Sequence, residues 1–161
     1  MMKRILSALL TVALIFVLMA CGGTNEKQEQ APDLQQYYDD FMASLGDNAP
    51  MMVPLEGDML EAAYPGLEAY SLKQSVMQMA GISAVAYEMA LVETESEADA
   101  QAVKAIFQDR VSSQIQNGAM YPATIEAWED ASVLQDGNVV ALIVAGPDQT
   151  AAVDAFNALF A

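Results

Sequence analysis

Residues 136–144 read DGNVVALIV, and this stretch does the most to decide the fold. The six residues 139–144 are all apolar and mostly β-branched, which is typical of a strand that is buried on both faces. Asp136 and Gly137 come directly before them, and an Asp-Gly pair favours a type I′ turn between antiparallel strands. Residues 133–134 supply apolar side chains on the other side of this turn. We therefore expect a β-hairpin here.

A second strand-forming region lies between residues 72 and 92, where polar and apolar residues alternate. Residues 72–79 alternate in the manner of a half-exposed strand, and Gly81 is expected to break or turn the chain. Residues 83–92 are apolar on both faces except for Glu88. This pattern predicts a central strand of the sheet, because an edge or surface strand keeps one polar face.

Helices are expected around these strands because their apolar residues recur at helical spacing. Asp33 is a good N-cap for the first helix, and Ser96 followed by Asp99 resembles a capping box for the longest one. Proline and glycine residues mark the breaks between helices. The expected helices are residues 33–46, 56–63 and 96–118, a short piece around Trp128, and a last helix that begins at Gly146-Pro147-Asp148.

The order of these elements predicts an α+β fold. We expect a two-layer sandwich in which helices pack on a largely antiparallel sheet of about four strands. Residues 33–161 are long enough to bury one core, so we expect a single, monomeric domain.

The N-terminal segment has the features of a lipoprotein signal peptide over residues 1–20. Two basic residues precede 16 uncharged residues, which as a helix span roughly 24 Å and fall short of the bilayer core. Residues 18–21 read LMAC and resemble the bacterial lipobox, in which cleavage follows Ala20 and Cys21 receives a diacylglyceryl group. Cys21 is the only cysteine of the chain. The alternatives are a one-pass membrane anchor and a cysteine that stands there by chance.

Residues 21–32 carry no apolar run and are expected to form a flexible, lipidated tether. The membrane is then reached through the N-terminal lipid, and the domain lies at the outer face of the cytoplasmic membrane. After Cys21 the chain keeps 22 acidic and four basic residues, a net charge of −18. Such a charge argues against nucleic acid as a partner and against electrostatic docking on anionic lipid.

The composition excludes several kinds of chemistry. The chain has no histidine, so serine or cysteine triads and imidazole zinc sites are not expected, and neither is any cofactor beyond the lipid. Carboxylates remain, and two of them can hydrolyse a glycoside. The acidic residues of 93–99 could hold Ca²⁺, although acids also collect at a helix N-terminus because of its dipole. We expect no metal site.

Two sets of residues are candidates for a binding site. Glu88 interrupts an apolar strand and needs a partner if it is buried, and Arg110 on the following helix is one of few cations available. We predict an ion pair or a shared polar pocket, with either a structural or a ligand-binding role. Tyr64, Tyr121 and Trp128 lie near the chain breaks and could pack as corners or form the rim of a groove.

With these elements in place, the chain resembles a family of small lipoproteins of low-GC Gram-positive bacteria that is catalogued only as a domain of unknown function. The resemblance covers about residues 55–160 and depends on the order of its features. It brings no established activity. The matching features are Tyr64-Pro65-Gly66, Tyr87-Glu88-Met89-Ala90, the helix from Ala98 to Arg110, Tyr121-Pro122, and Asp136-Gly137-Asn138-Val139.

These observations together predict a membrane-anchored, extracytoplasmic lipoprotein. We expect its domain to be a non-catalytic accessory module that binds an envelope protein or a wall polymer. A small solute-binding component of a transporter is the first alternative. A carboxylate-dependent enzyme acting on cell-envelope polymers is the second.

Overall fold

The computed structural model describes residues 31–161 of the chain. The signal peptide predicted over residues 1–20, its cleavage site at Ala20 and Cys21, and the tether up to residue 30 lie outside the described residues. No helix within residues 31–161 is both long enough and apolar enough to cross a bilayer.

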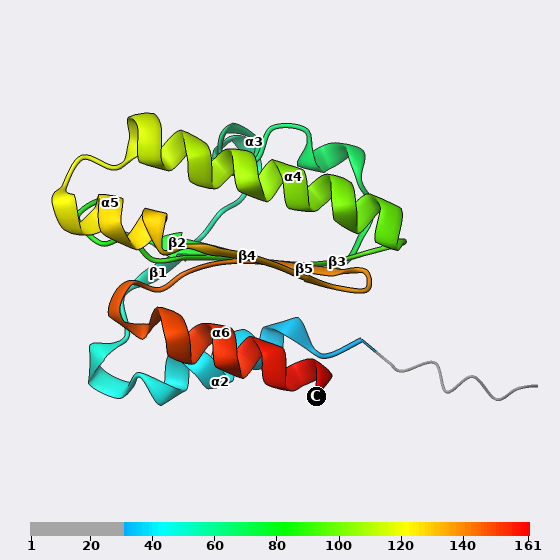
Figure 1. Cartoon of the computed structure of the whole chain (residues 1–161), viewed down its shortest axis with the longest axis horizontal. Coiled ribbons are helices and arrows are strands. Elements are labelled where there is room, and N and C mark those ends of the chain that lie inside the picture. The colour runs from blue at the N-terminus through cyan, green and yellow to red at the C-terminus, as the bar shows by residue number, and fades with distance from the viewer. Residues whose placement is uncertain (1–30) are drawn as a thin grey trace, which may run out of the picture. The chain divides into compact units, whose positions relative to one another are not determined.

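A five-stranded antiparallel sheet forms the middle of the domain (Figure 1), in the order β1-β2-β3-β5-β4. All residues of the two central strands, β3 and β5, are buried, as expected for runs that are apolar on both faces. The strands are β1 (Met52–Pro54), β2 (Leu72–Ala80), β3 (Glu88–Thr94), β4 (Ser132–Asp136) and β5 (Val139–Val144).

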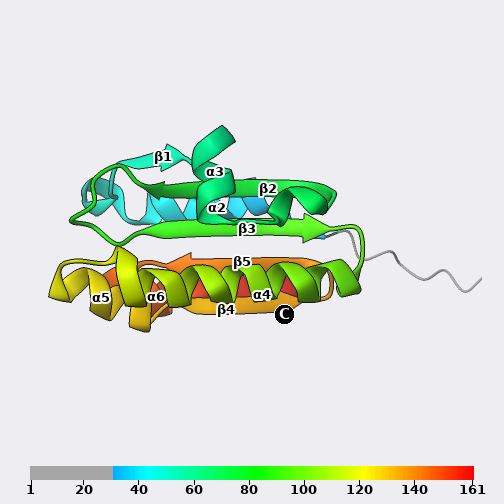
Figure 2. The same cartoon turned by 90° about the horizontal axis from the view of Figure 1, so that it is seen from above.

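Helices cover both faces of this sheet (Figure 1). The helices α2 (Leu34–Ser44) and α6 (Gln149–Asn157) lie on one face. The helices α3 (Gly57–Ala63), α4 (Glu97–Ser113) and α5 (Pro122–Glu129) lie on the other. Figure 2 shows α4 running along the strands over β4 and β5, with α3 over β2.

The predicted α+β class with an antiparallel sheet is confirmed, with one layer and one strand more than expected. The extra layer follows from β3 and β5, because two apolar faces both need cover. The extra strand is β1, which pairs with the end of β2 through Val53 and Met79. No strand is expected from the sequence at these residues.

Alternation along the strands divides the buried residues into two cores. Met89 and Leu91 of β3 face α2 and α6. Ala90 and Val92 face α3, α4 and α5, and Glu88 lies on this second face because side chains alternate with a period of two.

The β4–β5 hairpin forms where it was predicted, but the expected type I′ turn at Asp136-Gly137 is wrong. Asp136 pairs with Val139, so the two turn residues are Gly137 and Asn138. Gly137 has a φ of 51°, and no described residue other than glycine has a positive φ. A positive φ at the first turn residue alone, with glycine there, is the type II′ pattern.

The strand predicted from residue 83 begins only at Glu88. Residues 81–85 are exposed and contain a turn in which the Val85 amide donates to the Ile82 carbonyl. Their apolar alternation suits a strand, but the neighbouring strands end first: β2 stops at Ala80, and β5 pairs with β3 no further than Glu88. A segment without a partner strand stays a loop.

Candidate functional site

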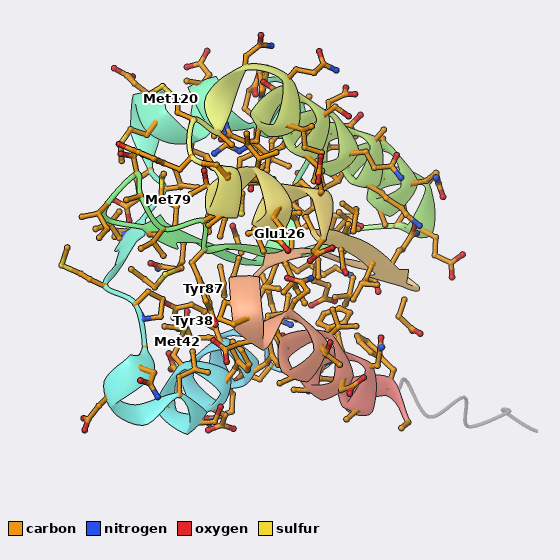
Figure 3. All side chains as sticks on the ribbon, turned by 60° about the vertical axis from the view of Figure 1, so that its left-hand side comes forward. Tyr38, Met42, Met79, Tyr87, Met120 and Glu126 are labelled. Carbon is orange, nitrogen blue, oxygen red and sulfur yellow. The ribbon has the colours of Figure 1, made fainter. Side chains whose placement is uncertain are left out.

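The candidate site lies at the end of the sheet where β2 stops and β3 begins. Glu88 is the first residue of β3, and Arg110 lies in the last turn of α4. Tyr64 directly follows α3, and Trp128 belongs to α5. All three helices on this face thus contribute a side chain to Glu88 or its partner. Figure 3 shows Met79, Tyr87 and Met120 on the same side of the domain.

Glu88 is 1% exposed, yet its carboxylate is fully engaged. Arg110 donates from Nε to Oε1 at 2.9 Å and from Nη2 to Oε2 at 2.7 Å. The Tyr64 hydroxyl donates to Oε1 at 2.5 Å. A bidentate pair of this kind is among the strong hydrogen-bonded contacts, and it offsets the cost of burying the charge.

Aromatic rings flank the guanidinium of Arg110. Its Cζ lies 5.4 Å from the ring centroid of Trp128 and 5.8 Å from that of Tyr64, within the range of cation–π attraction. The Tyr64 ring in turn packs edge-on against Phe107, with ring centroids 5.2 Å apart. The cation is therefore fixed on two sides by rings and on a third by Glu88.

The electrostatics of this cluster keep both phenol and guanidinium protonated. Burial raises the pKa of Tyr64 well above its ordinary value, and the negative charge of Glu88 raises it further. Burial by itself lowers the pKa of Arg110, but the hydrogen bonds and charge of Glu88 outweigh this and raise it. The Tyr64 hydroxyl therefore remains a donor, and Arg110 remains a cation, at ordinary pH.

A pocket of about 110 Å³ opens beside the pair. Its walls come from the 81–87 loop, from the π-helical segment η4 (Gln114–Gly118) and from α5. This π-helical turn directly follows the last residue of α4. Arg110 and Trp128 line this pocket together with Ile82, Val85, Ala119 and Thr124.

The structure brings together four of the five candidate residues, but it does not make a rim of the three aromatic ones. Glu88 and Arg110 form the pair, and Tyr64 and Trp128 are buried against it. Of the two alternatives, packing describes these two rings, which lie on the guanidinium beneath the surface, and Trp128 also lines the pocket. Tyr121 is 50% exposed and does not line the pocket.

Sequence reasoning missed the loop that forms one wall of the pocket. Ile82 and Val85 are large apolar residues that remain exposed, whereas the sequence suggested that they belong to a buried strand. A signal was present: Gly81 ends β2, and a chain break there can leave the next residues without strand partners.

Three of the four acidic residues of 93–99, namely Glu93, Glu95 and Asp99, have ordinary partners. Lys73 Nζ lies 3.9 Å from Glu93 Oε1 and 3.6 Å from Glu95 Oε2, and Ser96 caps α4 by accepting from the amide of Asp99 at 3.2 Å. Within residues 31–161 no three His, Cys, Asp or Glu side chains are placed to hold a metal ion.

Comparison with known proteins finds one family. The model of a family described as Domain of unknown function (DUF4358) matches residues 44–145. No curated protein and no solved structure matches the chain. The match includes Glu88, Arg110 and Trp128, and it starts earlier and ends earlier than the resemblance seen from the motifs.

Proposed function

This chain belongs to the DUF4358 family, and from that premise we propose that it is a membrane-anchored lipoprotein whose extracytoplasmic domain is a non-catalytic binding module. The observation that carries the proposal is the pocket beside Arg110, which has a fixed cation in its wall and exposed apolar side chains around it. The lipobox-like residues 18–21 and the resemblance to small lipoproteins of low-GC Gram-positive bacteria support the proposed compartment, the outer face of the cytoplasmic membrane.

The state of Glu88 favours binding over catalysis. A general acid or base must be within reach of the reacting group, whereas both oxygens of Glu88 accept from Arg110 and Tyr64. Glycoside hydrolysis needs two carboxylates across the scissile bond, and Glu88 is the one carboxylate among the described residues that line the pocket. This arrangement supports recognition of a partner.

The size of the pocket favours an accessory module over a solute-binding component. Sites that enclose a whole small molecule usually measure about 300–1,000 Å³, whereas this pocket has a volume of about 110 Å³. That space suits one group of a larger molecule, with the rest of the partner lying on the surrounding surface.

The chain enters the domain far from the pocket. The amide of Leu34 donates to Gln74 Oε1 at 3.0 Å, and Gln74 Nε2 donates to the Pro32 carbonyl at 3.0 Å. Gln74 pairs with Glu93, five residues along β3 from Glu88, a separation of about 17 Å along the strand. The pocket and the point where residue 32 meets the sheet thus lie at different ends of β3.

Lipidation of Cys21 is tested by mass spectrometry of the protein extracted from membranes. We expect a mature chain that begins at Cys21 and carries a diacylglyceryl group. An uncut leader or an unmodified thiol would contradict the proposed anchor.

Partner binding is tested by photo-crosslinking in cells. A photoreactive amino acid at Ser83, an exposed residue of the 81–87 loop, should give a discrete adduct with an envelope component. The matched control is Ala155, which is exposed on α6 at the opposite face of the sheet. The same products from both positions, or none from Ser83, would contradict a binding module centred on this pocket.

A further inference from the structure

We infer that the pocket binds the backbone carbonyl of an uncharged, extended peptide segment through the unused N–H groups of Arg110. This inference rests on the proposed binding function and names the chemistry of the partner. The segment belongs to a protein partner, and its apolar side chains pack on the exposed residues of the 81–87 loop.

The donors of Arg110 are only partly used. A guanidinium has five N–H groups, and within residues 31–161 those of Arg110 make two hydrogen bonds, both to Glu88. Three N–H groups remain: the two on Nη1 and the second one on Nη2. No buried side-chain nitrogen or oxygen of the described residues lacks a partner. Nη1 has no hydrogen bond among these residues, so it keeps some exposure to solvent, and Arg110 lines the pocket.

The charge balance selects a neutral acceptor. Glu88 already neutralises Arg110, so a ligand carboxylate would bring an excess negative charge into a partly buried site. It would also approach a domain whose acidic residues far outnumber its basic ones. A carbonyl oxygen accepts two N–H groups without adding charge. The site is thus suited to an amide rather than to an acid.

The surroundings favour a peptide over a sugar polymer. Ile82 is 56% exposed, Val85 lies beside it in the pocket wall, and Met120 follows the pocket residue Ala119 in an exposed position. Apolar side chains of this kind pack against alternate side chains of an extended peptide. Trp128 is 4% exposed and already contacts Arg110, so its face is not available to stack on a sugar ring.

Trp128 provides the readout, because it is the only tryptophan of the chain and lines the pocket. The lipidated full chain in detergent is titrated with N-acetyl-trialanine methylamide while the tryptophan emission is followed. Acetate and N-acetylglucosamine are titrated in parallel, to represent a carboxylate and a glycan amide. We expect a saturable change in emission with the peptide, at concentrations about tenfold or more below those at which acetate or N-acetylglucosamine has an effect. A tenfold difference in affinity corresponds to about 1.4 kcal/mol of binding free energy.

Two variants link this signal to the site. Arg110→Lys keeps a cation opposite Glu88 but removes the planar donor set, and it should weaken peptide binding about tenfold or more. Ile82→Asp leaves the ion pair intact and should weaken binding while the urea unfolding midpoint stays unchanged. Met59→Asp is the matched control, because Met59 is 54% exposed on α3 outside the pocket lining.

Each other outcome overturns the inference. Equal or tighter binding of acetate would make the site an anion site, and a response to N-acetylglucosamine alone would make it a glycan site. The inference of peptide recognition would be contradicted by no response to the peptide, or by an equal loss of peptide affinity in Ile82→Asp and Met59→Asp. If Ser83 still gives its adduct in these cases, the binding module stands and only the ligand class is wrong. If both experiments fail, the proposed function fails too.

Discussion

The two faces of the sheet are both covered by helices, but they are stabilised in different ways. Beneath α2 and α6 the buried cluster is apolar and aromatic, and Tyr37 satisfies its hydroxyl by donating to the Ala152 carbonyl at 2.8 Å. Beneath α3, α4 and α5 the sheet carries Glu88, paired with Arg110. A buried ion pair is often no more stable than apolar residues of the same size. The difference indicates that one face serves stability and that the other gives up some stability to hold a cation at the pocket.

Removal of the Arg110 cation should cause the largest loss of stability among the variants that compare the two faces. Arg110→Leu leaves Glu88 buried without its charged partner, so we expect a loss of about 3–5 kcal/mol in the free energy of unfolding. Urea unfolding followed by circular dichroism measures it. Lys104→Leu is the control, because Lys104 lies on the same helix and forms no ion pair within residues 31–161. Similar losses in the two variants would contradict a structural role for the pair.

A double variant sharpens the same point. Replacement of both Glu88 and Arg110 by leucine makes this face as apolar as the other one. We expect most of the loss in Arg110→Leu to be recovered because neither charge is then left alone, with about 1–3 kcal/mol remaining because the buried Tyr64 hydroxyl has lost its acceptor. A double variant as unstable as Arg110→Leu would show that packing, and not the unpaired carboxylate, causes the loss.

The buried tyrosines give a smaller and directly comparable effect. Tyr64→Phe removes a hydrogen bond to a charged acceptor and should cost about 1.5–3 kcal/mol, whereas Tyr37→Phe removes a bond to a neutral carbonyl and should cost about 1 kcal/mol. The same urea titration compares the two variants. Equal losses would mean that the hydrogen bonds of Tyr64 and Tyr37 contribute equally to the free energy of unfolding.

Alkaline pH should reveal the raised pKa of Tyr64. Below pH 10 both the folded and the unfolded state keep the phenolic proton. Above pH 10 only the unfolded state releases it, so stability falls as the pH rises, by about 1.4 kcal/mol at pH 11 for this residue. The decrease in unfolding free energy from pH 9 to pH 11 should therefore be larger in the wild type than in Tyr64→Phe. An equal fall in both proteins would place the alkaline sensitivity elsewhere.

The helix caps should differ least between the faces. Asp33 accepts from the Gln36 amide at the start of α2, and Ser96 accepts from the Asp99 amide at the start of α4. Replacement of either cap by alanine should cost about 1 kcal/mol, as thermal or urea unfolding measures. A much larger loss for one cap would mean that it also supports the core on its own face.

The elements that could be predicted from the sequence are those with strong local signals. Asp33 and Ser96 begin helices as expected, and the apolar run of residues 139–144 forms a central strand. The Glu88–Arg110 proximity also followed from one charge in an apolar strand and a scarcity of cations. Each of these conclusions needs only the local pattern and the cost of burying polar groups.

The remaining features depend on contacts that are distant in sequence. The 81–87 segment alternates like a strand, but whether it pairs is decided by where β2 and β5 end. The burial of Tyr64 and Trp128 is decided by three helices meeting over one guanidinium. A local pattern carries no information about either. The walls of the pocket beside Arg110, unlike the Glu88–Arg110 pair itself, were therefore not predictable from the sequence.

If the domain is anchored through Cys21 as proposed, the positions of its chain ends decide which end of the sheet is joined to the tether. Residue 31 and the last residue, Ala161, lie at the same end of the sheet (Figure 1), away from the 81–87 loop and α5. A circular permutant that joins these two ends and opens the chain at residues 49–51 would carry the tether at the opposite end. The same core, with the same pocket, would then be presented in reverse.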